Sequence, residues 1–259
     1  MDFTAFWSHW IWPFITAILG FFFAYLVLRQ YIERRKPHQL SWFIGLLFYA
    51  LAAAMEAYSE YAWSWNPWVY RIYIVLAASL VGFLGLGTLY LLSKKRIWGH
   101  LYAAFNVIGI AIFLYGTMTT KLATEFLKPG ITVGGQALGA SLSFPRFMSL
   151  FFNIPGSLLL LGGAVYSVIL FSRKKEYAYR MWANVIIAAG TIVIAGVGSM
   201  ARAGKAVGLY LAEMVGAALL LWGFIKASTL EKGTRAVRER RTAQVEARKI
   251  PTEDLGTPR

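Results

Sequence analysis

The chain has 259 residues, of which 58% are hydrophobic, and it carries a formal net charge of +14 at pH 7. A water-soluble domain cannot hide that much apolar surface, whereas a lipid bilayer solvates it. Cysteine is absent, which excludes disulfide bonds, thiolate metal sites and cysteine nucleophiles. We therefore expect an integral membrane protein.

Seven mostly apolar stretches follow one another along the chain. A helix that rises ~1.5 Å per residue needs roughly 20 residues to cross a ~30 Å hydrocarbon core, so each stretch predicts one transmembrane helix. The predicted fold is an all-α bundle of seven spans, over residues 10–28, 40–62, 70–92, 97–118, 145–170, 181–202 and 207–226. We expect residues 1–226 to form one seven-span membrane domain and residues 227–259 to form a basic cytoplasmic tail.

The basic residues gather in every second gap between the spans. The first, third and fifth gaps and the tail counted from Lys226 hold twenty of the 26 lysines and arginines, and the remaining six are Arg71, Lys121, Lys128, Arg146, Arg202 and Lys205. The positive-inside rule then places the N-terminus outside and the C-terminus in the cytoplasm, here of a bacterial cell membrane. This distribution accounts for the positive net charge as a topology signal, so the charge does not indicate nucleic-acid binding. The lipid bilayer is the expected partner, and the basic tail is where a protein partner would bind.

Three features between or within the spans concern helix packing. The long gap at 119–144 is rich in glycine and small residues, and predicts a flexible loop, with an outer lid or a re-entrant piece as the alternatives. Pro155-Gly156 inside the fifth span is expected to kink or loosen that helix. Small residues that allow close helix approach recur in three spans, and we interpret them as packing seams: Gly82, Gly85, Gly190 and Gly216.

Ionisable residues inside the spans are the best indication of function, because each costs about 2.5–3.5 kcal/mol at the centre of a membrane helix. Glu56 and Glu60 lie four residues apart in the second span, so they share one helical face. Glu213 lies in the seventh span, which runs in the opposite direction. We therefore expect Glu56 and Glu213 at a common height, ~10 Å below the outer boundary.

Other polar residues fall near the same outer surface. The hypothesis is an outward-opening polar cavity that binds a small ligand or a lipid, with these candidate residues: Glu56, Glu60, Arg71, Tyr73, Asn153, Arg202 and Glu213. In it, Glu56 and Glu213 would bind a cation, a proton or a cationic ligand, and the arginines would bind an anionic group. The open alternative is a set of buried salt bridges, Glu56–Arg71 and Glu213–Arg202, that fix the helix register.

Signatures of common membrane cofactors and enzymes are missing from the sequence. The three histidines, His9, His38 and His100, lie near span ends, whereas two haem ligands would need a matching depth. Neither a G-x-S-x-G nor an H-E-x-x-H motif occurs. We expect no cofactor, no metal ion and no catalytic activity.

Two stretches, EAYSEYAWSWNPWVYRIYIVLAASLVGFLGLGTLYLL and ANVIIAAGTIVIAGVGS, resemble a group of uncharacterised bacterial multi-pass integral membrane proteins. This resemblance covers spans 2, 3 and 6 and implies no activity. In topology alone the chain is similar to the seven-helix sensor regions of bacterial receptors and to microbial rhodopsins, an analogy that concerns fold. The retinal lysine of the rhodopsins is missing, because the seventh span carries only Lys226, at its cytoplasmic end.

Together these observations favour a ligand-binding or sensing module, or a membrane subunit of a larger assembly. The alternative is a small proton- or cation-coupled transporter that uses Glu56 and Glu213. A transporter would show broken helices at mid-membrane and an inverted repeat. In the sequence, Pro155-Gly156 alone points to the first of these features.

Overall fold

The computed structural model describes residues 3–129, 134–140, 143–172, 182, 185–194, 196 and 209–227. These residues form helices and connections without any strand. The labelled helices are α1 (Phe3–Arg34), α2 (Pro37–Tyr61), α3 (Pro67–Leu92), α4 (Arg96–Thr119) and α5 (Phe144–Ser172), with two 3-10 turns, η1 (Thr124–Phe126) and η2 (Gly135–Leu138). Two further helices follow, Val185–Ile194 and Leu209–Ala227.

Six of the described helices are long and apolar enough to cross a membrane: Trp10–Arg34, Pro37–Tyr61, Pro67–Leu92, Arg96–Thr119, Phe144–Leu170 and Leu209–Ala227. They correspond to six of the seven predicted spans. The remaining prediction, 181–202, coincides with the shorter apolar helix Val185–Ile194, and most of its other residues lie outside the described part of the chain. The helices therefore indicate a multi-pass membrane protein.

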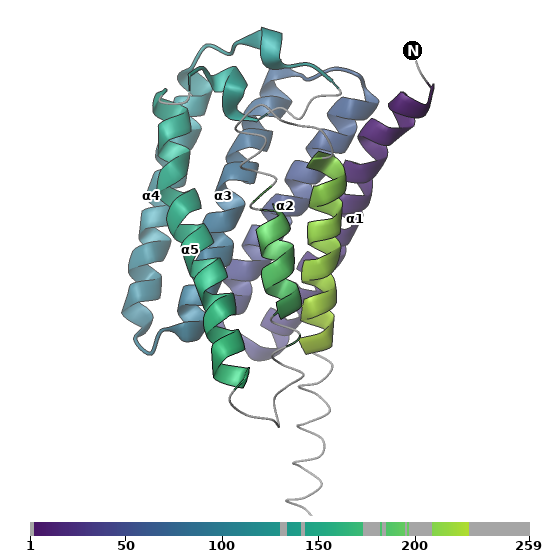
Figure 1. Cartoon of the computed structure of the whole chain (residues 1–259). Coiled ribbons are helices and arrows are strands. Elements are labelled where there is room, and N and C mark those ends of the chain that lie inside the picture. Colours follow the sequence, from purple (N-terminus) through teal and green to yellow (C-terminus); the bar gives the residue numbers. More distant parts are fainter. Residues whose placement is uncertain are drawn as a thin grey trace, which may run out of the picture.

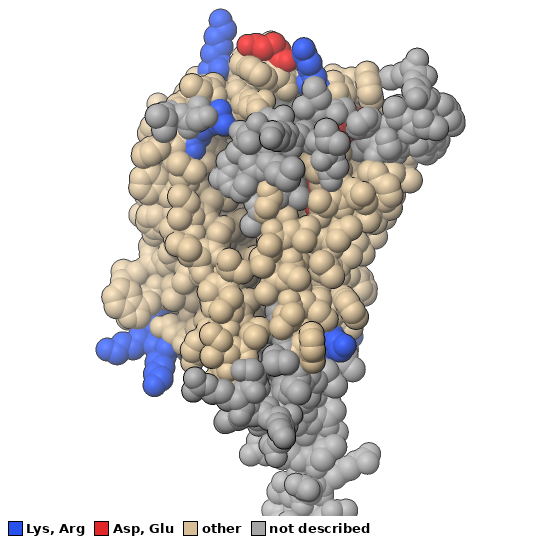
Figure 2. Space-filling model, in the orientation of Figure 1, with Lys and Arg blue, Asp and Glu red and all other residues tan. Residues whose placement is uncertain are grey.

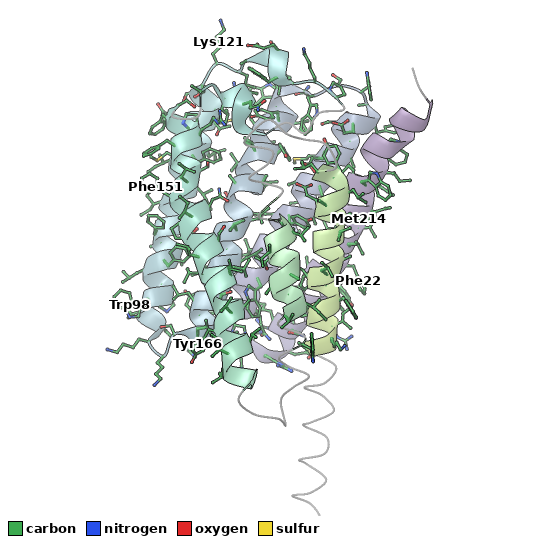
Figure 3. The ribbon with its side chains drawn as sticks, in the orientation of Figure 1. Phe22, Trp98, Lys121, Phe151, Tyr166 and Met214 are labelled. Carbon is green, nitrogen blue, oxygen red and sulfur yellow. The ribbon has the colours of Figure 1, made fainter. Side chains whose placement is uncertain are left out.

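The surface of the bundle matches this interpretation. Lysine and arginine side chains lie at the two ends, and the face between them is an uncharged belt (Figure 2). Large apolar side chains point outward from this belt, among them Phe22, Phe151 and Tyr166, which are 49%, 45% and 54% exposed (Figure 3). Such a surface is unfavourable in water and is solvated by acyl chains.

The helices run up and down the bundle, and α3 packs against α2, α4 and α5 (Figure 1). We call the end that carries the 62–66 turn and the 120–143 connection the cap end. The opposite end, where α1, α3 and α5 finish, is called the basic end. Helix α1 begins at the cap end and the 209–227 helix finishes at the basic end (Figure 1).

Proline and asparagine residues set where two of the helices begin. Pro37 and Pro67 open α2 and α3, at positions where the missing N–H has no helical partner to lose. The side chain of Asn66 caps α3 by accepting the backbone N–H of Trp68 at 2.8 Å. These local signals bring α2 and α3 together as an antiparallel pair at the cap end.

Glycine allows α5 to cross α3 at close range. A Cβ placed on Gly156 would lie 2.6 Å from the carbonyl oxygen of Val81, and one on Gly85 would lie 2.7 Å from the Cα of Gly156. This contact confirms a packing seam on α3. The expected loosening at Pro155 does not interrupt the helix, since α5 continues from Phe144 to Ser172.

The described parts of the 119–144 gap form a cap on the bundle rather than the free loop that was expected. Ala137 and Leu138 are 0% and 1% exposed and pack into the main core cluster. The Tyr70 hydroxyl donates to the Gly134 carbonyl at 3.0 Å. Arg146 donates to the Gly139 carbonyl at 2.8 Å, so α3 and α5 both hold this connection in place.

Candidate functional site

Two carboxyl groups from helices far apart in the sequence meet inside the bundle. Glu56 of α2 is 3% exposed, and its carboxyl group lies beside that of Glu213 in the 209–227 helix. Tyr73 of α3 is 5% exposed and donates its hydroxyl to Glu56 Oε1 at 2.6 Å. Three helices thus each contribute one polar side chain to the same point.

The positions of these residues along their helices explain why they meet. Glu56 lies five residues before the end of α2, and Tyr73 lies six residues after the start of α3. Both of these helix ends are at the cap end, so at ~1.5 Å per residue the two side chains lie roughly 7–9 Å into the bundle, and Glu213 meets them there from the 209–227 helix. The structure therefore brings together Glu56 and Glu213, as the common height predicted.

The contact between the two carboxyl groups has a chemical consequence. An ionised carboxylate only accepts hydrogen bonds, so two of them repel each other at contact distance. A hydrogen bond between Glu56 and Glu213 requires a shared proton, and two ionised groups at this distance require a cation. The pair therefore has the chemistry of a site for a proton or a small cation.

Glu60, one turn beyond Glu56 on α2, makes a second polar contact with the last helix. Its side chain is fully buried, and its Oε1 accepts the Tyr210 hydroxyl at 3.0 Å and the Trp65 indole N–H at 3.4 Å. Tyr210 lies three residues before Glu213, so both point from one face of the 209–227 helix. Sequence reasoning missed Tyr210 and Trp65, although this spacing was a usable signal for Tyr210.

The turn after α2 positions Trp65. The N–H of Ser64 donates to the Ser59 carbonyl at 3.0 Å, and that of Trp63 donates to the Glu60 carbonyl at 3.2 Å. This pair of bonds is a Schellman motif, with Trp63 in the left-handed region at φ 51°. The motif reverses the chain abruptly, and so it returns the indole of Trp65 to Glu60 on the helix just completed.

Aromatic rings close the site against water. The rings of Trp65 and Tyr73 lie 5.2 Å apart between centroids, and Tyr70 packs edge-on against Trp65 at 6.4 Å. Tyr49 of α2 donates its hydroxyl to the backbone carbonyl of Glu213 at 3.0 Å. The hydroxyl and indole donors therefore lie among rings that exclude solvent.

Arg71 has a different partner from the one that the salt-bridge alternative assigned to it. Its guanidinium donates to the carbonyls of Thr117 and Thr120, the latter at 2.9 Å, and lies over the Trp68 ring. The carbonyls at a helix C-terminus lack helical partners and attract cations. Arg71 and Tyr73 are two residues apart on α3, so their side chains point in nearly opposite directions from the helix. Tyr73 therefore points to α2 while Arg71 points to α4, and no Glu56–Arg71 pair forms.

Two predicted site residues stand apart from the cluster. The amide of Asn153 donates to the Ser149 carbonyl on its own helix at 2.8 Å. Arg202 lies outside the described residues, as does any pair that it makes with Glu213. Within the described part of the chain, no group of three or more histidine, aspartate or glutamate side chains is arranged to hold a metal ion.

The candidate site is thus defined by Glu56 and Glu213 with Tyr73, and by Glu60 with Tyr210 one turn nearer the cap end. It joins the α2–α3 pair to the 209–227 helix. No family model, no curated protein and no solved structure matches this chain.

Proposed function

We propose that this chain is a membrane-embedded binding or sensing module, or a membrane subunit of a larger assembly, that binds a proton or a small monovalent cation at Glu56 and Glu213. It has no catalytic activity of its own in this proposal. The observation that carries it is the direct contact of two carboxyl groups from different helices, with the Tyr73 hydroxyl on one of them.

The cost of burying these groups supports a functional role. Each ionisable side chain at membrane depth costs about 2.5–3.5 kcal/mol on insertion scales, so two at one point are expensive. A purely structural bond between α2 and the last helix already exists at Glu60 and Tyr210. The Glu56–Glu213 pair adds little stability to this contact between the helices unless a proton or a cation binds between the two carboxyl groups.

The surroundings favour a proton or a monovalent cation over a divalent metal ion. Calcium takes six to eight oxygen ligands, and the described residues offer no cluster of three acidic or histidine side chains.

The distribution of basic residues orients the site. With the basic end in the cytoplasm, the cap end and the carboxyl pair belong to the outer leaflet. The module would then respond to conditions outside the cell and transmit them to a partner through the basic tail, 227–259.

The experiment compares cation binding by the parent chain with that by Glu56→Gln and Glu213→Gln. Thermal unfolding of the purified protein is followed in sodium, potassium and methylammonium chloride at constant ionic strength. Glu125→Gln is the matched control, because Glu125 is exposed in η1 at the cap end. We expect one cation to raise the unfolding temperature of the parent and of Glu125→Gln, and to leave both site variants unchanged.

Two results would count against the proposal. In the first, every cation changes the unfolding temperature of Glu56→Gln as much as that of Glu125→Gln, and the two variants take up equal numbers of protons on acidification. The carboxyl pair then binds neither a cation nor a proton. If liposomes show pH-driven or cation-driven flux that Glu56→Gln abolishes, the chain is a transporter instead. The continuous α5 helix gives no sign of the broken span that transporters use.

A further inference from the structure

An apolar cavity lies near the basic end, away from the carboxyl pair. It has a volume of about 140 Å³ and is lined by α1, α2, α3, α5 and the two helices that follow them. Phe23, Leu46, Leu84, Leu160 and Phe224 represent five of these walls. Among the described residues that line it, none is acidic or basic.

The polar side chains in the wall offer little to a polar ligand. Trp42 and Thr88 both donate to the carbonyl of Leu84, each at 3.2 Å. The indole of Trp42 lies against Gly87, where there is no room for a Cβ. With these two donors committed to one carbonyl, the Ser167 hydroxyl is the remaining polar side-chain group among the described lining residues, so the interior favours an apolar occupant.

The cavity reaches the surface beside a group of cations. Leu91 and Leu92 line it and are 51% and 40% exposed, so its mouth lies at the last turn of α3. From Leu84 to Leu92 the wall spans ~12 Å, which is less than half of a hydrocarbon core. Lys94 and Lys95 follow directly and are exposed, and the stretch from 84 to 96 contains no acidic residue.

We propose that this cavity holds a segment of one acyl chain of an anionic phospholipid from the leaflet at the basic end, with the lipid phosphate beside Lys94 and Lys95. The size fits a segment of about six carbon atoms of such a chain, because an apolar cavity of about 150 Å³ accommodates benzene, which has six carbon atoms. A helix of a second copy, ~10 Å wide, is too large to enter. The charged tail of this chain is too polar to remain there.

The attraction comes from packing and charge rather than from leaving water. An acyl chain in a bilayer is already in apolar surroundings, so transfer into the protein gains no hydrophobic free energy. An unfilled cavity, however, lacks dispersion contacts on its walls, and a methylene chain supplies them. The lysines at the mouth then select an anionic headgroup over a zwitterionic one.

The test incubates the detergent-purified chain with equal amounts of phosphatidylglycerol and phosphatidylcholine of identical acyl chains, and counts retained lipids by native mass spectrometry. Ala164→Leu fills the cavity, since Ala164 lines it and is 8% exposed. Val165→Leu is its control, because Val165 is 48% exposed on the same helix. Filling about half of the space should lower retention of both lipids about ten-fold.

The headgroup is tested with Lys94→Gln/Lys95→Gln, and Lys121→Gln at the cap end serves as control (Figure 3). The double variant should still retain lipid, but its preference for phosphatidylglycerol should fall by about five-fold for each lysine removed. Lys121→Gln should keep the preference of the parent chain.

Several outcomes would overturn the proposal: a parent chain that retains no phospholipid, equal retention of the two lipids, or equal retention by Ala164→Leu and Val165→Leu. If Ala164→Leu does not elute as a single folded species, Ser167→Leu, which fills the same cavity, replaces it. A fluorescence measurement does not depend on either cavity-filling variant. Phosphatidylglycerol brominated along its acyl chain should quench the fluorescence of Trp42, so the parent chain should lose more fluorescence than Trp42→Phe does. Equal quenching of the two proteins would refute occupancy of the cavity.

Discussion

The hydrogen bond from Tyr73 to Glu56 can be tested by removing one hydroxyl group. Tyr73→Phe keeps the ring that packs against Trp65 and deletes the donor 2.6 Å from Glu56 Oε1. Both side chains are almost fully buried, at 5% and 3% exposed, so water has little access to replace the lost donor. We expect the variant to fold and to be less stable.

The magnitude follows from two limits. A buried acceptor that loses its donor costs about 1–3 kcal/mol in soluble proteins. Hydrogen bonds between membrane helices measured by double-mutant cycles average about 0.6 kcal/mol and reach about 1.7 kcal/mol. Because the Tyr73–Glu56 bond is short and buried, we expect the free energy of unfolding to fall by about 1.5 kcal/mol, near the upper membrane limit.

The assay is reversible unfolding of the purified chain in mixed micelles, by SDS titration followed by tryptophan fluorescence. Tyr58→Phe is the control, because Tyr58 is on α2 near the same height but is 60% exposed. A substitution at such a surface position should change the stability by less than about 0.5 kcal/mol. In a Glu56→Gln background, the cost of Tyr73→Phe should fall to about 0.6 kcal/mol, because the bond then joins two neutral groups.

Equal stabilities of Tyr73→Phe and Tyr58→Phe would refute this reasoning. That result would mean that Glu56 finds another donor, or that the carboxyl group is wetter than its burial indicates. An unchanged cost in the Glu56→Gln background would refute the charge argument and leave the hydrogen bond itself in place.

Three further predictions test the packing, the cap end and the orientation. Gly156→Ala should lower the free energy of unfolding by about 1–3 kcal/mol through overlap with the α3 backbone, whereas Gly162→Ala, with nothing within 4 Å, should be neutral or stabilising in the same titration. Arg71→Gln should lose about 1–2 kcal/mol and expose the C-terminal end of α4 to hydrogen exchange, and unchanged exchange there would contradict its capping role. Since the chain has no cysteine, Lys121→Cys should react with an impermeant maleimide on intact cells and Lys95→Cys only after lysis. Labelling of both on intact cells would refute the orientation.

Several features of the fold followed from local sequence. Runs of apolar residues of the length of a bilayer predicted the helices, and six of them are present as such. The prolines at 37 and 67 begin α2 and α3 three residues before the predicted starts at 40 and 70, at positions where a residue without an N–H is tolerated. The direction of the helices then followed by alternation, which placed Glu56 and Glu213 at one height.

The partners of the polar residues were decided by the tertiary structure. The position of Arg71 along its span put it at the same end as Glu56. The rotation of α3, however, directs Arg71 to the end of α4, and it is Tyr73 that hydrogen-bonds with Glu56. Tyr210 reaches Glu60 across 150 residues of sequence, a contact that no local pattern encodes. The length and polarity of a segment fix that it crosses the membrane, because each residue transfers to lipid independently of distant ones. Its rotation and neighbours depend on close crossings such as Gly85–Gly156, which exist only once the helices have packed.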